Sequence, residues 1–331
     1  MPLLRHKWLI LTSFIFASLG ITGYFYWQNN LPLISPIALI ESITNNVPQK
    51  SKIVYGFLPY WNLKYADKLY ISPLTHIAYF AIDLNADGSI NKKVNKKELE
   101  PGWNKFDSKE NQKVNYQSKL LGQKQILTIT AMDPDLIESL VNQPASRNNA
   151  IKSIIYLLIE SKYDGLNIDF EYVGEPDQTT RNNFSFFLKD LSMECKKAKS
   201  LCTIDIDIFG DTADKRRLWD LTTINPYVDH VIVMAYDYYR KSSTKAGPIA
   251  PITGACVTSQ SENCLEQDIS TNLAKILKAI PSEKILLGIP FYGYEWQTAS
   301  EDFMANTYPK TGSLATYQRI QSLFSNPKII N

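Results

Sequence analysis

A regular alternation of strand-like and helix-like segments constrains the fold of this chain more than any other feature. Short runs rich in β-branched and aromatic residues recur along it, and several helical patterns separate them. The predicted strands are 53–59, 76–82, 125–130, 165–171, 203–208, 231–237 and 284–291. Ser146 is placed to cap one of the intervening helices. The alternation predicts an α/β protein with a parallel sheet, and it favours a (β/α)8 TIM barrel over an open doubly wound sheet.

Polar and aromatic residues gather where the predicted strands end. Active sites of such barrels lie at the C-terminal ends of the strands. Glu171 ends the fourth predicted strand, and Asp237 ends the sixth. The aromatic residues that follow the first and seventh strands are Tyr60, Trp61, Tyr292 and Trp296. His76 and His230 begin strands instead, so we expect both at the opposite, structural face.

The fourth predicted strand carries a row of polar groups on one face. Because residues two apart share a face of a strand, Asn167, Asp169 and Glu171 point one way and the apolar residues between them point the other. Apolar walls and a neighbouring carboxylate both raise the pKa of a carboxyl group, which suits Glu171 to act as a general acid. An acid beside a second carboxylate, lined by Tyr and Trp, suits the cleavage of glycosidic bonds.

These residues resemble a known family. The segment 164–171 resembles the signature Asp-x-x-Asp-x-Asp-x-Glu of glycoside hydrolase family 18, the chitinase-like (β/α)8 barrels. Segments 54–61, 234–237 and 288–296 resemble the first, sixth and seventh strands of that family, in the same order. Together with 247–251, they are most similar to the bacterial branch that includes spore-cortex and other peptidoglycan N-acetylglucosaminidases. The resemblance covers about residues 53–320.

The resemblance implies a retaining hydrolysis in which the substrate assists. Glu171 would protonate the leaving glycosidic oxygen and later activate water, while the 2-acetamido carbonyl of the sugar attacks the anomeric carbon. Asp169 would orient the acetamido N–H, and Tyr236 would hydrogen-bond the acetamido group. The residues expected to bind substrate are Asn167, Asp237, Met234, Tyr60, Trp61, Asp207, Tyr292 and Trp296. No metal or organic cofactor is implied.

The fifth predicted strand contributes Asp207. Asp205 and Asp207 share the face opposite the isoleucines that should meet the helices, so both are expected to point into the barrel. Asp207 lies nearer the C-terminal end and is expected to border the acetamido pocket. The alternative for Asp207 is a salt-bridged residue of the barrel interior.

The chain departs from the family pattern at three places. Asn167 replaces the common Asp, and an amide cannot share a proton with Asp169; Asn at this position is found in the peptidoglycan-linked branch. The third strand lacks the frequent Ser-x-Gly-Gly. No Trp follows Trp296, so we expect a C-terminally incomplete barrel of about seven strands with open edges.

The N-terminus predicts a membrane anchor. A basic segment precedes 8–27, a run of twenty residues without a charge, which is long enough to span a bilayer. We therefore expect a cytoplasmic segment 1–7, an anchor 8–27, a linker 28–50 that contains Pro and Asn, and a barrel over 51–331 outside the cytoplasm of a single-pass membrane protein. The alternative is a cleaved signal peptide and secretion.

The four cysteines fit an oxidising compartment. Sequence alone cannot choose among their three possible pairings, although proximity favours Cys195 with Cys202 and Cys256 with Cys264. No histidine lies near them and no Cys-x-x-Cys occurs, which argues against a metal site. The net charge of +2 gives no reason to expect nucleic acid.

The leading prediction is hydrolysis of β-1,4 bonds next to N-acetylglucosamine in peptidoglycan or chitin-like polymers. Peptidoglycan is favoured because the chain looks bacterial and tethered at the cell surface. The alternative is a non-catalytic, lectin-like surface protein on the same scaffold. Such proteins typically lose the acid, whereas this chain retains Glu171, Asp169 and Tyr236.

Overall fold

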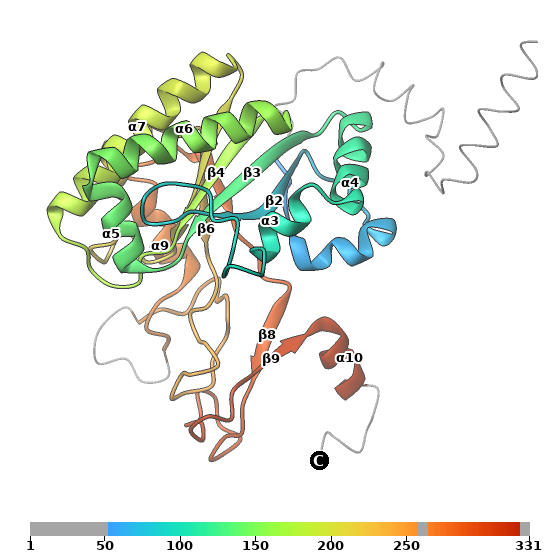
Figure 1. The fold of residues 1–331 in the computed structure, drawn as a ribbon. Coiled ribbons are helices and arrows are strands. Elements are labelled where there is room, and N and C mark those ends of the chain that lie inside the picture. Colours follow the sequence, from blue (N-terminus) through green and yellow to red (C-terminus); the bar gives the residue numbers. More distant parts are fainter. Residues whose placement is uncertain (1–51, 257–263, 325–331) are drawn as a thin grey trace, which may run out of the picture. The chain divides into compact units, whose positions relative to one another are not determined.

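Seven parallel strands form the central sheet in the order of the sequence (Figure 1). The computed structural model describes residues 52–256 and 264–324. The strands are β1 (Tyr55–Pro59), β2 (His76–Asp83), β3 (Lys124–Ala131), β4 (Gly165–Phe170), β5 (Thr203–Phe209), β6 (His230–Met234) and β7 (Ile285–Leu287). The predicted α/β class with a parallel sheet is therefore confirmed, and seven strands are present as expected.

Contacts across the interior show that the sheet curls like part of a barrel. The Tyr55 hydroxyl of β1 donates to Asp205 Oδ2 of β5 over 3.3 Å, although three strands separate them in the sheet. The rings of His76 on β2 and His230 on β6 lie 5.8 Å apart. Both histidines thus fill the interior at the strand starts, the structural position expected for them. Within the described residues, β1 and β7 are the two edges of this sheet.

Helices cover the outer face of the sheet (Figure 1). They are α3 (Pro101–Phe106), α4 (Lys109–Leu120), α5 (Pro134–Asn142), α6 (Pro144–Ser161), α7 (Gln178–Ala198), α8 (Leu221–Ile224) and α9 (Ile269–Ile276), with 3-10 turns η1 (Tyr60–Lys68), η2 (Asn225–Tyr227) and η3 (Ser282–Lys284). The last helix, α10 (Tyr317–Phe324), lies away from this sheet. The prediction that Ser146 caps a helix is wrong, because α6 already begins at Pro144 and Ser146 is a buried residue within the helix. Proline suits the first helical turn, since the N–H that it lacks would have no partner in the helix at that position.

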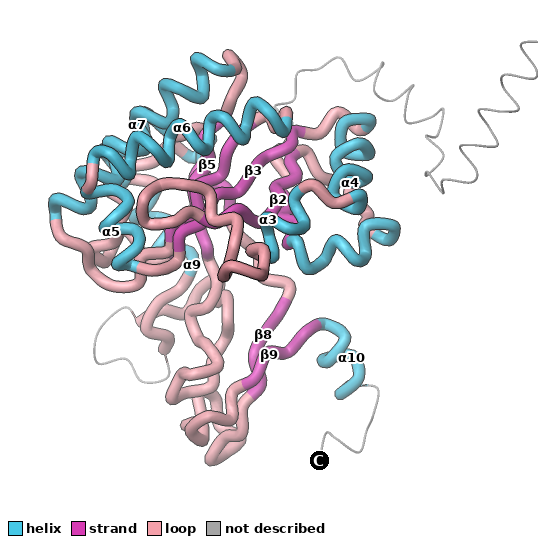
Figure 2. Tube along the Cα trace, viewed as in Figure 1, coloured by secondary structure: helices cyan, strands magenta, loops and turns pink. Residues whose placement is uncertain are grey.

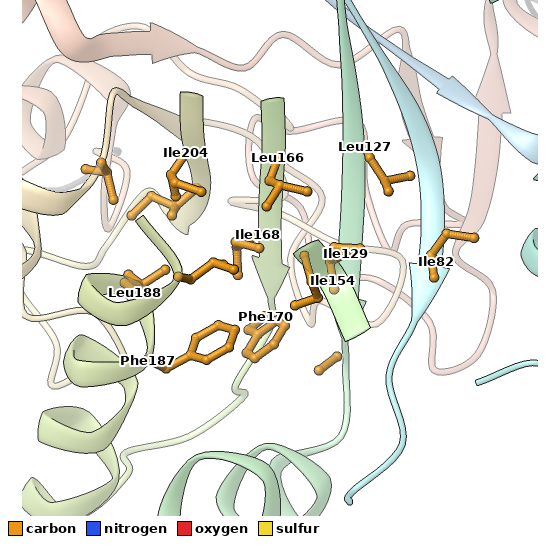
Figure 3. Packing of buried hydrophobic residues seen from close by; sticks show 14 of the residues in the cluster. Ile82, Leu127, Ile129, Ile154, Leu166, Ile168, Phe170, Phe187, Leu188 and Ile204 are labelled. Atoms are coloured by element: carbon orange, nitrogen blue, oxygen red, sulfur yellow. The ribbon is translucent and has the colours of Figure 1, made fainter. Parts of the chain in front are cut away.

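The core lies between the outer face of the strands and these helices (Figure 3). Leu166, Ile168 and Phe170 of β4 are fully buried there. The Phe170 ring stacks on Phe187 of α7 with 5.6 Å between centroids. Burying each such side chain contributes roughly 1.5–3 kcal/mol. This packing fixes which face of β4 meets the helices. The polar residues of the other face, beginning with Asn167, therefore point towards the interior.

Three strands end earlier than predicted. β4 stops at Phe170 and β6 at Met234, so Glu171 and Asp237 lie after the strands rather than in them. β7 is only Ile285–Leu287. Pro290 lacks a backbone N–H and cannot extend the ladder. The residues Tyr292–Glu295 instead form β8, which pairs antiparallel with β9 (Ser313–Thr316), and Figure 2 shows both strands apart from the seven-stranded sheet.

The disulfides join Cys195 to Cys202 and Cys256 to Cys264, the pairing favoured by proximity. Among residues 52–256 and 264–324, no helix combines the length and the apolar character needed to cross a membrane. The predicted segment 1–7, anchor 8–27 and linker 28–50 all lie outside the described residues.

Candidate active site

A cavity of ≈950 Å³ opens where β4, β5 and β6 end. Glu171 lines it from β4, Phe209 from β5, and Met234, Tyr236 and Asp237 from the end of β6. Tyr292 of β8 closes one side. Five of the predicted site residues therefore meet in one cavity at the carboxyl edge of the sheet, where parallel barrels hold their active sites.

Glu171 is held directly after β4. Its backbone N–H donates to the Ala131 carbonyl of β3 over 2.9 Å, so the residue keeps the position of a strand residue although the strand has ended. Burial raises the pKa of Glu171, the Arg240 guanidinium lowers it, and the Asp237 carboxylate raises it, with a net upward shift. A carboxyl group with a raised pKa at the wall of a cavity is suited to donate a proton.

Asp169 lies beneath Glu171 and is almost fully buried, with 4% of its surface exposed. Burial, and then the charge of Glu171, raise the pKa of Asp169 to about 8. Its Oδ1 has no hydrogen-bond partner within the part of the chain that the structure describes. Burial and the charge of Glu171 thus favour the protonated form of Asp169.

Asn167 and Asp207 continue this polar row inside the barrel. Asn167 is the register partner of Asp205, which places Asp207 of β5 beside Asp169 one step further along. Burial, and then the charge of Asp169, raise the pKa of Asp207 well above its ordinary value. Asn167 is fully buried, and its amide lies near enough to Asp207 to lower the pKa of that carboxyl group, although neither amide atom makes a hydrogen bond of good geometry with a described residue.

The interior direction expected for both aspartates of β5 is confirmed, but their partners differ. Asp205 Oδ1 lies 2.7 Å from His230 Nδ1, a contact that is an ion pair when the ring is protonated. Asp207 has no ion pair within the described chain, and its Oδ2 is unpartnered there. The salt-bridged alternative therefore describes Asp205 and not Asp207.

Asp237 turns the chain sharply after β6. It adopts a left-handed conformation with φ of 61°, which non-glycine residues seldom adopt. Its Oδ1 accepts hydrogen bonds from the hydroxyls of Tyr292 at 2.8 Å and Tyr294 at 3.1 Å. These bonds hold the carboxylate at the cavity wall and tie β8 to the end of β6.

Tyr236 lies among the carboxyl groups of the site. Burial, and then the charges of Asp207 and Asp169, raise its pKa, so its hydroxyl keeps its proton and remains a donor. Gly288 lets the ring pack closely: a Cβ there would lie 2.8 Å from the Val233 carbonyl oxygen and 3.0 Å from the Tyr236 ring.

Three aromatic residues predicted to bind substrate do not line this cavity. Tyr60 and Trp61 lie on η1, where their rings pack edge to face at 4.9 Å, and Trp61 is 52% exposed. Trp296 packs against Tyr294 with 6.0 Å between centroids. Asp169, Asn167 and Asp207 also lie outside the lining, but directly beneath it.

Sequence reasoning missed the cationic residues of the cavity. Its lining includes Lys215 and Arg217 from the segment after β5, and Arg240 and Lys245 from the segment after β6. The signal was present, since Lys215-Arg216-Arg217 and Arg240-Lys241 are basic runs that follow predicted strands. Among residues 52–256 and 264–324, no group of His, Cys, Asp or Glu is arranged to hold a metal ion.

Known proteins show similar folds. The Ostrinia furnacalis Group IV chitinase, solved in complex with allosamidin, superposes with a TM-score of 0.69 at 20% identity over 83% of this chain and 78% of that one. The class V chitinase of Nicotiana tobaccum superposes with a TM-score of 0.70 at 17% identity, over 82% of this chain and 79% of that one. These superpositions show that most of this chain shares its fold with the two chitinases.

Sequence comparison gives the family. The "Putative sporulation-specific glycosylase YdhD" of Bacillus subtilis is 26% identical over 273 residues, which cover 80% of this chain and 58% of that protein. "Probable chitinase 2" of Drosophila melanogaster is 28% identical over 185 residues, 55% of this chain and 36% of that protein. The chain thus spans about half the length of these relatives. The family model "Glycosyl hydrolases family 18" matches residues 44–330, and the chain therefore belongs to that family.

Proposed function

We propose that the protein hydrolyses β-1,4 glycosidic bonds next to N-acetylglucosamine. The observation that carries the proposal is Glu171, an acid with a raised pKa at the wall of a cavity, directly above the buried acid Asp169. Membership of glycosyl hydrolases family 18 supports the reaction class. The named chitinases with similar folds support a substrate built from N-acetylglucosamine.

The proposed reaction proceeds in two steps with assistance from the substrate. Glu171 gives its proton to the leaving glycosidic oxygen as the acetamido carbonyl of the sugar bonds to the anomeric carbon. Asp169 accepts the acetamido N–H, and the Tyr236 hydroxyl donates to the acetamido oxygen. Glu171 then takes a proton from water, which attacks the anomeric carbon and opens the ring that the acetamido group formed. Retention of configuration follows from two displacements at one carbon.

The other cavity residues hold the sugar. Met234 and Asp237 border the acetamido group in this proposal, with Asp237 oriented by Tyr292 and Tyr294. Asn167 and Asp207 support Asp169 from below, and Asp207 borders the acetamido pocket. Trp61 and Trp296 would stack on more distant sugars of a longer chain, because both lie outside the cavity.

We further propose that the natural polymer is peptidoglycan and that the hydrolase works outside the cytoplasm. The relative named a putative sporulation-specific glycosylase supports a bacterial cell-wall substrate. Two disulfides support an oxidising compartment. The uncharged run 8–27 would anchor the protein in the membrane. A fusion to a reporter that folds only in an oxidising compartment tests this: an inactive reporter would contradict the topology.

Replacing the proposed acid tests the reaction. In the full chain, Glu171→Gln keeps the shape of the side chain but has no proton to donate, so we expect kcat on N-acetylglucosamine oligomers and on peptidoglycan to fall by at least about 10²-fold, as loss of general acid catalysis does. Glu160→Gln on the exposed face of α6 is the matched control. Equal binding of oligomers by both proteins, with no cleavage by the wild type, would favour the lectin-like alternative.

A further inference from the structure

Four cationic side chains line the cavity, and the proposed reaction does not use them. The segments after β5 and β6 supply four cationic side chains to the lining: Lys215, Arg217, Arg240 and Lys245. Away from Glu171 and Asp237, only Asp211 and Glu266 bring negative charge to the same lining. We call the four cationic residues the cationic wall.

Only part of this positive charge is neutralised within the protein. Arg217 binds the Asp211 carboxylate with two hydrogen bonds, Nε to Oδ1 at 3.0 Å and a terminal nitrogen to Oδ2 at 2.7 Å. Lys215 lies 3.0 Å from the same Oδ2. Two cations thus share one carboxylate, and the Lys215 side chain is 46% exposed.

Arg240 is loosely held. Its Nε donates to the Asp237 carbonyl oxygen at 3.3 Å and stays 3.9 Å from Oδ2 of the same residue. The other carboxylate oxygen, Oδ1, is taken by Tyr292 and Tyr294. The Arg240 side chain is 57% exposed and lines the cavity.

Lys245 forms no ion pair with any residue of 52–256 or 264–324, and it is exposed. Glu266, the other carboxylate of the lining besides Asp211, also forms no such pair there. Within the described residues, Lys245 and the exposed parts of Lys215 and Arg240 are therefore the cations of the lining that are free to meet a ligand, with Glu266 as the unpaired carboxylate of the same lining.

The cavity has room for more than the reacting sugar. Its ≈950 Å³ is at the upper end of the range of about 300–1,000 Å³ that ligand pockets occupy. A polymer of N-acetylglucosamine alone is uncharged and gives this wall no partner. Peptidoglycan strands carry carboxylates, on the lactyl ether of every second sugar or on the peptide stems attached to it. Charged donors facing a carboxylate form shorter and stronger hydrogen bonds than neutral pairs do.

We propose that the cationic wall is a subsite for carboxylates attached to the sugar chain, with Lys215, Arg240 and Lys245 as the groups that bind them. This inference rests on the proposed function, since it concerns the same cavity. It makes the substrate an acidic N-acetylglucosamine polymer, and it gives the preference for peptidoglycan over chitin a physical cause in named side chains.

Lys215 and Lys245 are the residues to change in a test. Arg240 acts on the pKa of Glu171, so its loss would alter the acid as well as the subsite. A Lys215→Gln/Lys245→Gln variant removes two positive charges at little change in length. The matched control is Lys152→Gln/Lys278→Gln, which removes two exposed lysines that do not line the cavity.

Binding is measured in the Glu171→Gln background of the full chain, so that no strand is cleaved. The ligands are fluorescent glycan strands of alternating N-acetylglucosamine and N-acetylmuramic acid, either free of peptide or with stems, each also with its carboxylates converted to amides. We expect the strands with carboxylates to bind more tightly than their amides, and the two changes at the wall to reduce this preference about tenfold. The preference should shrink in 0.5 M salt, because screening weakens exposed charge pairs.

The outcome separates this inference from the proposed function. A preference for carboxylates that the wall variant leaves as large as in the control variant overturns the subsite, and so does the absence of any preference. If the wall variant loses the preference for carboxylates on peptide-free strands, the cationic wall binds the lactyl carboxylate. If it loses the preference only on strands with stems, the cationic wall binds carboxylates of the peptide. Failure of the wild type to cleave any strand overturns the hydrolase proposal alone, since binding by the Glu171→Gln protein still reports on the wall.

Discussion

Replacing Asp169 with Asn should make the folded state less sensitive to alkaline pH. The pKa of Asp169 is about 8 in the folded protein against an ordinary value of 3.8. Between these two values the folded state holds a proton that the unfolded state releases, so the free energy of unfolding falls as pH rises. The slope for one group is about 1.4 kcal/mol per pH unit. Between pH 6.0 and 7.5, the free energy of unfolding of the wild type should therefore fall by about 2 kcal/mol because of this buried acid.

An asparagine has the same shape and does not titrate, so Asp169→Asn should escape this loss. Urea denaturation, followed by tryptophan fluorescence at pH 6.0, 6.75 and 7.5, gives the free energy of unfolding of both proteins. From pH 6.0 to pH 7.5, the free energy of unfolding of the variant should rise by about 2 kcal/mol relative to that of the wild type. The variant should also lose activity. Comparing the two proteins cancels His76, whose pKa is lowered to about 4 by burial and which acts in the opposite direction below pH 6.5. It does not cancel Asp207, whose pKa is raised by burial and then by the charge of Asp169, so the difference reports on the two carboxyl groups together. Parallel curves would refute the assignment of a proton to Asp169. Asp135→Asn, an exposed change on α5, shows the effect of removing any carboxylate.

Two further predictions concern the scaffold. Phe187→Ala removes a fully buried ring that stacks on Phe170, and we expect thermal or urea denaturation to show a loss of about 3–5 kcal/mol; the exposed neighbour Phe186→Ala should lose much less. Cys195→Ser/Cys202→Ser opens a short loop between α7 and β5, and it should cost about 2 kcal/mol in oxidising buffer and nothing relative to the wild type under reducing conditions.

The fold was predictable because its signals are local and periodic. The alternation of polar and apolar residues along 165–170 determines which face of β4 meets the helices, and Phe184, Phe187 and Leu188 show the matching face of α7. The grouping of Glu171, Asp237 and Tyr292 followed from one rule, that parallel strands end at the same edge, whereas Tyr236 came from the family resemblance. The disulfide pairing followed from proximity along the chain.

The parts that sequence did not give depend on contacts between distant segments. The left-handed turn at Asp237 ends β6 early, and nothing in Met-Ala-Tyr-Asp indicates it. Trp61 and Trp296 follow strands, as the cavity residues do. Their rings pack on Tyr60 and Tyr294 and do not line the cavity. Predicting the cationic wall would have required placing two basic runs next to each other. These runs are far apart in the sequence, and only the fold brings the segments after β5 and β6 to one cavity.

Asp237, with its left-handed backbone, joins the end of β6 to the segment 238–245 that lines the cavity. An L-residue in this conformation costs roughly 1–2 kcal/mol, and the hydrogen bonds from Tyr292 and Tyr294 offset part of it. Beyond this residue the chain leaves the sheet and carries Arg240 and Lys245 to the cavity. Substitutions in 238–245 can thus change which polymers are held, while the strands beneath the acid keep their packing. Under the proposed function, Lys245 can change without altering the acid, whereas Arg240 links selectivity to the chemistry because it also acts on the pKa of Glu171.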